Sequence, residues 1–220
     1  MKSLKALMQK LDGSRSVYAT GDLIDRGPAS KGVVQFIMDN GIKTVMGNHE
    51  HLMLASLGLI KAPGYGNKEH ARRSWMKNGG LDTIASYNKG IRAEDASFDQ
   101  NHLDFLKSLP YVLSVPDQLG DGRTIQITHA AVYGKTIKDD LEWLKSPLKF
   151  SQFPLNYTFL YNRDSPYVNP DLLQVFGHTV LSEPMVEEGW AVIDGGCAYG
   201  RELWALDVKN MAVIRQVMID

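Results

Sequence analysis

The sequence predicts an α/β domain with parallel strands in its first half and mainly β structure in its second half. Two strand-loop-helix units follow a short first helix, a mostly helical stretch covers residues 69–108, and short β-prone runs follow Pro110. Strands that alternate with helices pair in parallel, because each helix carries the chain back along the sheet. A length of 220 residues suits one core, so we expect a single domain over residues 1–220.

The first expected strand follows a short amphipathic helix. Apolar residues recur at helical spacing over residues 2–11, and Asp12-Gly13 ends that pattern. A β-prone run over residues 16–20 comes next. The order helix, turn, strand is therefore expected at the start of the chain.

The second strand-loop-helix unit is bounded by recognisable start and stop signals. Ser30 is expected to cap a helix that ends at Asn40-Gly41. A strand over residues 42–46 follows, and another helix begins near His49. This unit repeats the pattern that favours parallel pairing.

A helical insertion separates the two halves of the chain. Proline and glycine mark a loop over residues 62–67, and the helical pattern over residues 69–108 follows it. The strands expected in the second half cover residues 111–115, 124–128, 173–176, 190–193, 202–208 and 212–218.

Composition and charge exclude several classes of protein. Hydrophobic residues make up 44% and charged residues 22% of the chain, as in globular proteins with a packed core. A net charge of −1 gives no long-range attraction to nucleic acid or to an anionic membrane. Without an apolar run long enough to span a bilayer, and with a lone Cys197 that cannot form an internal disulfide, the protein is expected in the cytoplasm.

Polar side chains follow four of the expected strands. Asp22 lies in the segment Gly-Asp-Leu-Ile-Asp-Arg-Gly after the first strand, and Asn48 follows the second. His129 and His178 each follow an apolar run in the second half. A single strand-terminal histidine is usually structural, but carboxylate, amide and imidazole groups at four strand ends together indicate a site for a divalent metal ion.

Two of these segments resemble sequence motifs of a known family. Residues 21–27 are similar to the GDxxDRG motif of the phosphoprotein phosphatases, which are calcineurin-like metallophosphoesterases, and residues 47–50 match their GNHE motif. Residues 162–164 resemble the segment with the family's second phosphate-binding arginine. Residues 75–80 and 192–196 look like those of small bacterial and phage members. The resemblance implies two packed mixed β-sheets flanked by helices, with a helical insertion.

The resemblance also implies a set of metal ligands. Asp22 would bridge two metal ions, and Asn48, His129 and His178 would complete the second metal site. Mn²⁺ is the favoured metal, with Fe or Zn as alternatives.

The same resemblance assigns the residues that act on the substrate. Arg26 and Arg163 would bind the phosphate, because guanidinium groups match phosphate oxygens in geometry and charge. His49 would be the general acid and Asp25 would orient it. The nucleophile would be a metal-activated hydroxide.

The family's first motif, GDxHG, does not occur in this sequence. We therefore expect the chain to be N-terminally truncated relative to the family, to bind one metal ion instead of two, and to be a weaker catalyst. No other histidine is expected to substitute: His51 should lie on the surface. The lost strand would have paired beside residues 16–20, so self-association through an exposed sheet edge is expected.

Three functions remain open from the sequence. The first is a protein phosphatase that acts on phosphoserine, phosphothreonine or phosphotyrosine. The second is a small-molecule hydrolase similar to the bis(5'-nucleosyl)-tetraphosphatases. The third is a phosphate-binding domain whose catalysis is impaired, because the first metal motif is absent.

Overall fold

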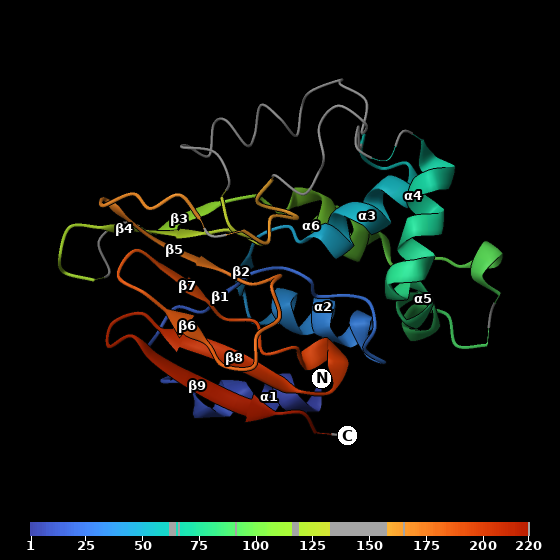
Figure 1. The fold of residues 1–220 in the computed structure, drawn as a ribbon. Helices are drawn as coiled ribbons and strands as arrows, with labels where there is room; N and C mark the ends of the chain where they lie inside the picture. The colour runs from blue at the N-terminus through green and yellow to red at the C-terminus, as the bar shows by residue number, and fades with distance from the viewer. Residues whose placement is uncertain are drawn as a thin grey trace.

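The computed structural model describes residues 1–61, 65, 67–90, 92–115, 119–132, 158–164 and 166–219. Within these residues helices and strands alternate as the sequence predicts, and the α/β fold class is confirmed (Figure 1). The loop expected over residues 62–67 lies mostly outside the described residues. Every described helix is too short or too polar to span a bilayer.

The second half of the chain forms a five-stranded mixed sheet in the order β3-β4-β5-β7-β6. Its strands are β3 (Leu113–Val115), β4 (Thr124–Ile127), β5 (Leu172–Phe176), β7 (Trp190–Val192) and β6 (Met185–Val186). β4, β5 and β7 are parallel, whereas the edge strands β3 and β6 pair antiparallel. Because parallel strands end at the same edge of a sheet, the residues that follow β4 and β5 emerge side by side.

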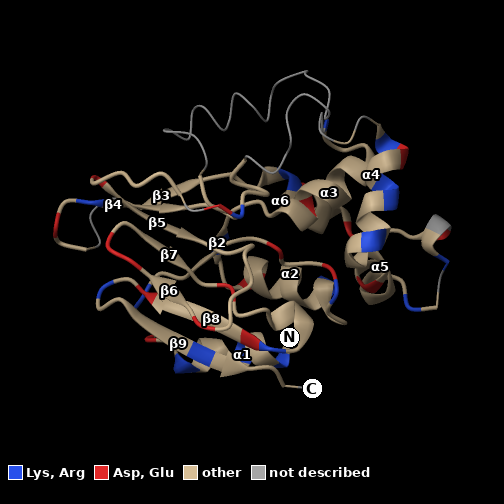
Figure 2. Cartoon of the chain, in the orientation of Figure 1, with Lys and Arg blue, Asp and Glu red and all other residues tan. Residues whose placement is uncertain are grey.

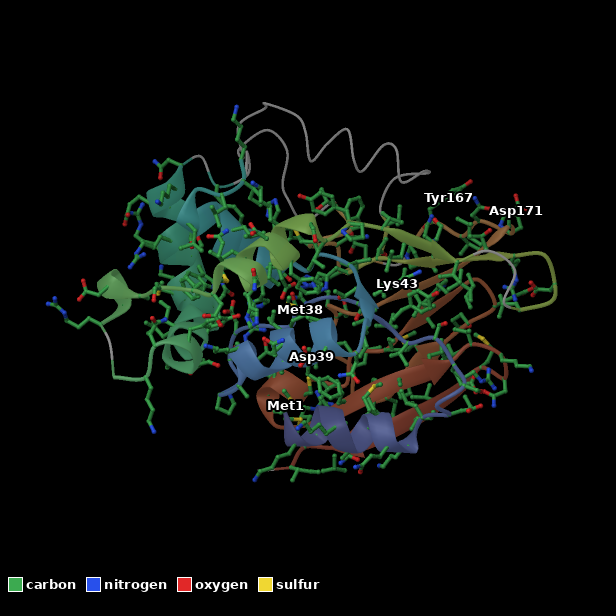
Figure 3. All side chains as sticks on the ribbon, turned by 180° about the vertical axis from the view of Figure 1, so that it is seen from behind. Met1, Met38, Asp39, Lys43, Tyr167 and Asp171 are labelled. Carbon is green, nitrogen blue, oxygen red and sulfur yellow. The ribbon has the colours of Figure 1, made fainter. Side chains whose placement is uncertain are left out.

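The first half contributes one parallel strand pair and three helices. They are α1 (Lys2–Lys10), β1 (Tyr18–Ala19), α2 (Ser30–Asp39), β2 (Lys43–Thr44) and α3 (Asn48–Leu57). Tyr18 lies opposite Lys43, and β1 is parallel to β2 as predicted. Seen from behind, α2 ends at Met38 and Asp39 shortly before β2 (Figure 3). The loops after β1 and β2 therefore leave the pair at the same end.

The prediction that Ser30 caps α2 is wrong. The helix begins at Ser30 itself, with Ala29 in the N-cap position and no side-chain cap hydrogen bond. The Ser30 hydroxyl instead accepts the backbone N–H of Asp25 at 3.2 Å and lies 3.2 Å from the Thr83 hydroxyl. A contact between distant segments therefore replaces the local cap that the sequence favours.

The predicted helical insertion is confirmed. It contains α4 (Lys68–Trp75), α5 (Leu81–Tyr87) and α6 (Gln100–Ser108), with a π-helical turn at Met76–Gly80 and a 3₁₀ turn at Ala93–Asp95. α4 packs along α3, and α5 packs against α2 (Figure 1). Trp75 and Leu106 are fully buried in the core that these helices share with Met53. The insertion is therefore an integral part of the hydrophobic core.

A second layer faces the five-stranded sheet. It contains the pair β1-β2 and the antiparallel hairpin of β8 (Glu202–Asp207) and β9 (Ala212–Val217). Helix α1 packs against this hairpin (Figure 1). Val45, Ile127 and Val175 are buried between the layers. Acidic and basic side chains are interspersed over the described elements, in agreement with the net charge of −1 (Figure 2).

A cavity of about 1410 Å³ lies between the two layers. Leu7, Tyr18 and Leu206 line its apolar part, and the polar loops after β1, β2, β4 and β5 line its other end. Among the described strands β1 pairs only with β2 and β8 pairs only with β9, so the cavity separates two pairs that each have an unpaired edge. The second sheet that the resemblance implies is divided at this point.

Candidate active site

The loop after β1 brings two aspartates and an arginine to the end of the strand. Its backbone has positive φ angles at Gly21 (87°), Asp22 (55°), Asp25 (72°) and Arg26 (59°). For any residue other than glycine, a left-handed backbone conformation is unfavourable by about 1–2 kcal/mol. The loop therefore needs support from its surroundings. The turn places the side chain of Asp25 inside the protein, where it is fully buried.

Glu50 provides this support from the first turn of α3. Its carboxylate accepts the backbone N–H groups of Asp22 at 2.9 Å, Leu23 at 2.7 Å and Gly47 at 2.9 Å. Burial raises the pKa of Glu50 to about 7 and the charge on Asp22 adds to that effect, while the N–H groups favour the carboxylate. This role was not predicted from the sequence, although a glutamate at the third position of a helix is the residue that accepts the N-cap N–H in a capping box.

The structure brings Asp22, Asn48, His129 and His178 together where β1, β2, β4 and β5 end. Three ligand atoms, one each from Asp22, His129 and His178, lie within 4.8 Å of one another. Asn48 Oδ1 lies 2.9 Å from His129 Nε2 and 3.0 Å from His178 Nδ1. His129 Nε2 is also 3.5 Å from a carboxylate oxygen of Asp22. We call these four side chains the donor cluster.

The donor cluster has the chemistry of a cation site. His129 Nδ1–H donates to the Thr20 carbonyl at 2.7 Å, and this contact turns Nε2, the nitrogen available to a metal ion, toward the cluster. Burial lowers the pKa of His178 to about 3, with His129 and Arg163 adding to the effect, so the His178 ring is neutral. Asn48 Oδ1, His129 Nε2 and His178 Nδ1 lie within 3.1 Å of one another, so a cation bound among them would be within reach of all three. Oxygen and imidazole donors in this combination suit Mn, Fe or Zn.

His49 and Asp25 form a buried pair beside the donor cluster. His49 Nδ1 lies 2.6 Å from a carboxylate oxygen of Asp25, and His49 Nε2 lies 3.9 Å from Asp22. Burial alone would lower the pKa of His49, but the charges of Asp22 and Asp25 outweigh burial and raise it. A protonated imidazole held in this way can donate the proton on Nε2 to a group bound at the cluster.

Arg26 and Arg163 line the same cavity as the donor cluster. The Arg26 guanidinium lies over the Tyr199 ring, 5.0 Å from its centre. Arg163 Nη1 donates to the His178 carbonyl at 3.1 Å. Because a guanidinium group has five N–H donors, these contacts leave both arginines able to bind an anion.

The expectation that His51 lies on the surface is wrong. Residues 48–56 are all buried, because α4 and α6 pack against α3. The His51 ring packs against Tyr65 and Tyr111, with centroid distances of 6.4 and 6.2 Å. Burial lowers the pKa of His51 to about 4, so it is a neutral core residue.

Comparisons with known proteins agree on the type of domain. A family model described as calcineurin-like phosphoesterase matches residues 2–182. The chain is 25% identical over 187 residues to serine/threonine-protein phosphatase 1 of Salmonella typhimurium, a match that covers 85% of this chain and 76% of the relative. It is 26% identical over 217 residues to the asymmetrical bis(5'-nucleosyl)-tetraphosphatase PrpE of Anoxybacillus flavithermus, covering 91% and 78% of the two chains.

A similar fold also occurs among solved structures. A crystal structure of a candidate diadenosine tetraphosphatase superposes with a TM-score of 0.61 at 17% sequence identity. The superposition covers 100% of this chain and 87% of the other. At this identity the likeness concerns the fold alone.

Proposed function

The chain belongs to the calcineurin-like phosphoesterase family, and we propose that it is a metal-dependent protein phosphatase acting on phosphoserine and phosphothreonine. The observation that carries this proposal is the buried pair of His49 and Asp25, joined by a 2.6 Å hydrogen bond. A serine or threonine alkoxide is a poor leaving group and needs a proton as the ester bond breaks. A nucleotide polyphosphate is a better leaving group and depends much less on protonation.

Each residue of the site has a proposed task. Asp22, Asn48, His129 and His178 would hold a divalent metal ion, and Glu50 fixes the loop that carries Asp22. A bound divalent ion lowers the pKa of water and offsets negative charge on the phosphoryl group.

The substrate is held and protonated by the remaining residues. Arg26 and Arg163 bind the phosphoryl oxygens and stabilise the charge that builds up in the transition state. His49 donates the proton on Nε2 to the leaving oxygen, while Asp25 holds the proton on His49 Nδ1 and stabilises the imidazolium.

A dinucleoside tetraphosphate is the second candidate substrate. Tyr199 is 59% exposed and its ring lies beneath Arg26, so an aromatic face is available for a nucleobase beside a phosphate-binding group. The names of the relatives include such hydrolases as well as a protein phosphatase.

The substrate class is tested by comparing kcat/KM, with Mn²⁺ present, for a phosphoserine peptide and for diadenosine tetraphosphate. We expect the peptide to be preferred and Tyr199→Leu to have little effect on its hydrolysis. A preference for the tetraphosphate, lost selectively in Tyr199→Leu, would replace the first substrate with the second. Metal binding without turnover of either substrate would favour a catalytically impaired phosphate-binding domain.

The metal content provides an independent prediction. In the part of the chain that the structure describes, one group of three or more His, Cys, Asp or Glu side chains lies within metal-binding reach. We therefore expect about one Mn²⁺ per chain by elemental analysis after dialysis. Free Mn²⁺ at a hundredfold excess over its Kd should raise the free energy of unfolding by about 2.7 kcal/mol.

A matched pair of variants locates the ion. His129→Ala should weaken Mn²⁺ binding by at least about tenfold in calorimetry, because it removes a ligand. His70→Ala, at an exposed position of α4, should bind Mn²⁺ like the unaltered protein. Two equivalents of metal would reveal ligands beyond the donor cluster, and equal binding by the two variants would remove His129 from the site.

A further inference from the structure

The helical insertion reaches the Asp25 carboxylate directly. Trp75 Nε1–H, at the end of α4, lies 3.0 Å from Oδ1 and 3.1 Å from Oδ2 of Asp25. The Thr83 hydroxyl, on α5, donates to Oδ1 at 2.6 Å and also accepts the backbone N–H of Asp25 at 2.8 Å. Oδ2 is the atom that lies 2.6 Å from His49 Nδ1. Both oxygens of the carboxylate therefore have partners from different elements.

These contacts are shielded from water. The exposed fractions of the whole residues are 0% for Trp75 and Thr83, 5% for Asp25 and 2% for His49. Water cannot reach these groups to take the place of a missing partner. A buried carboxylate that loses a hydrogen-bond donor therefore keeps the full cost of that lost bond. The orientation of Asp25 is therefore set by the insertion.

The turn at Met76–Gly80 fixes where Trp75 lies. A Cβ atom on Gly80 would come within 2.7 Å of the Trp75 ring, so the ring packs directly on the backbone of the turn. Gly79 has a φ angle of 103°, and its carbonyl accepts the backbone N–H of Arg26 at 3.4 Å. The same turn thus contacts both the residue that supports Asp25 and the loop that carries a phosphate-binding arginine.

We propose that Trp75 and Thr83 are positioning residues for proton donation by His49, acting through Asp25. A carboxylate held at both oxygens cannot rotate, so it keeps His49 Nδ1 in a fixed direction and leaves Nε2 pointing toward the substrate. Neither Trp75 nor Thr83 lines the cavity that contains the donor cluster. This inference rests on the proposed role of His49 as general acid.

The kinetic test compares two leaving groups. Thr83→Val removes the hydroxyl and keeps the shape of the side chain, whereas Thr83→Ser keeps the hydroxyl. Thr83→Val and Trp75→Phe should lower kcat for a phosphoserine peptide by about tenfold, which is the usual scale for one buried hydrogen bond. The KM for the peptide and the rate with p-nitrophenyl phosphate should hardly change. Thr83→Ser should behave like the unaltered protein.

A packing control separates positioning from general loosening of the core. The Phe98 ring packs against Trp75 with a centroid distance of 6.1 Å but has no hydrogen bond to Asp25. Phe98→Leu should therefore affect the two substrates equally. If Thr83→Val and Trp75→Phe also lowered both rates equally, their role would be structural and the proposal would be overturned.

A spectroscopic readout is independent of turnover. The proton on His49 Nδ1, in a short bond to a buried carboxylate, should give a far-downfield NMR signal that is absent in His49→Asn. We expect this signal to shift or broaden in Thr83→Val and Trp75→Phe and to persist in Thr83→Ser. An unchanged signal in both donor-removing variants would overturn the proposal. A changed signal in a protein that does not hydrolyse phosphoserine would uphold the positioning role and reject the proposed substrate.

Discussion

Replacing His49 with asparagine is expected to lower the rate of phosphoserine peptide hydrolysis by about 10²–10⁴, while p-nitrophenyl phosphate is hydrolysed at nearly the original rate. The nitrophenolate ion leaves readily without a proton, whereas the serine alkoxide does not. Asparagine can still form a hydrogen bond to Asp25 but cannot donate a proton at neutral pH. The measurement is kcat for both substrates with saturating Mn²⁺.

The control for this prediction is His70→Asn, the same change at an exposed position of the insertion. It should leave both rates unaltered. Equal losses on the two substrates in His49→Asn, at unchanged Mn²⁺ affinity, would exclude His49 as the general acid. His49 would then act in binding or in support of the neighbouring Asn48.

The second large effect is expected at the two arginines. Arg26→Ala and Arg163→Ala should each lower kcat/KM by about 10²–10³ for both substrates, because each removes charge stabilisation of the phosphoryl group whatever group leaves. Arg26→Ala keeps a Cβ atom at the positive φ angle of 59°, so it tests the guanidinium without relieving the backbone. Inhibition by inorganic phosphate should weaken in the same variants.

Arg73→Ala is the matched control, because Arg73 is an exposed arginine of α4 that pairs with Glu69 on the same helix. It should change neither the rates nor phosphate inhibition. A loss confined to the phosphoserine peptide in Arg26→Ala or Arg163→Ala would mean that the arginine contacts the peptide and not the phosphoryl group.

The donor cluster could be anticipated from the sequence because its geometry follows from local rules. Each of its residues lies two to four positions after the end of a strand, and parallel strands end at a common edge. Helix periodicity and turn signals likewise located α2, α3 and the insertion. β6 was missed because Met185 and Val186 stand between Pro184 and Glu187 and belong to no longer β-prone run.

The supports of the site could not be anticipated, because they depend on distant segments. Nothing near Ser30 indicates that its hydroxyl contacts Thr83 instead of capping a helix. The burial of His51 depends on helices that pack on α3 from elsewhere in the chain. Trp75 and Asp25 are 50 positions apart in the sequence. A tryptophan in a helix indicates a residue of the hydrophobic core and does not reveal a hydrogen bond to a distant carboxylate.

The strained loop after β1 also bears on the order in which the protein folds. Its left-handed residues are held by Glu50 and by Thr83, the latter from 58 positions along the chain. His129 binds the Thr20 carbonyl from 109 positions away. Bringing such distant segments together carries an entropic cost that local helices do not have. On the ribosome the loop therefore lacks its supports until α3 and α5 have emerged. The donor cluster cannot close before His178, which follows β5, has been made, so the candidate site forms only after most of the chain has been synthesised.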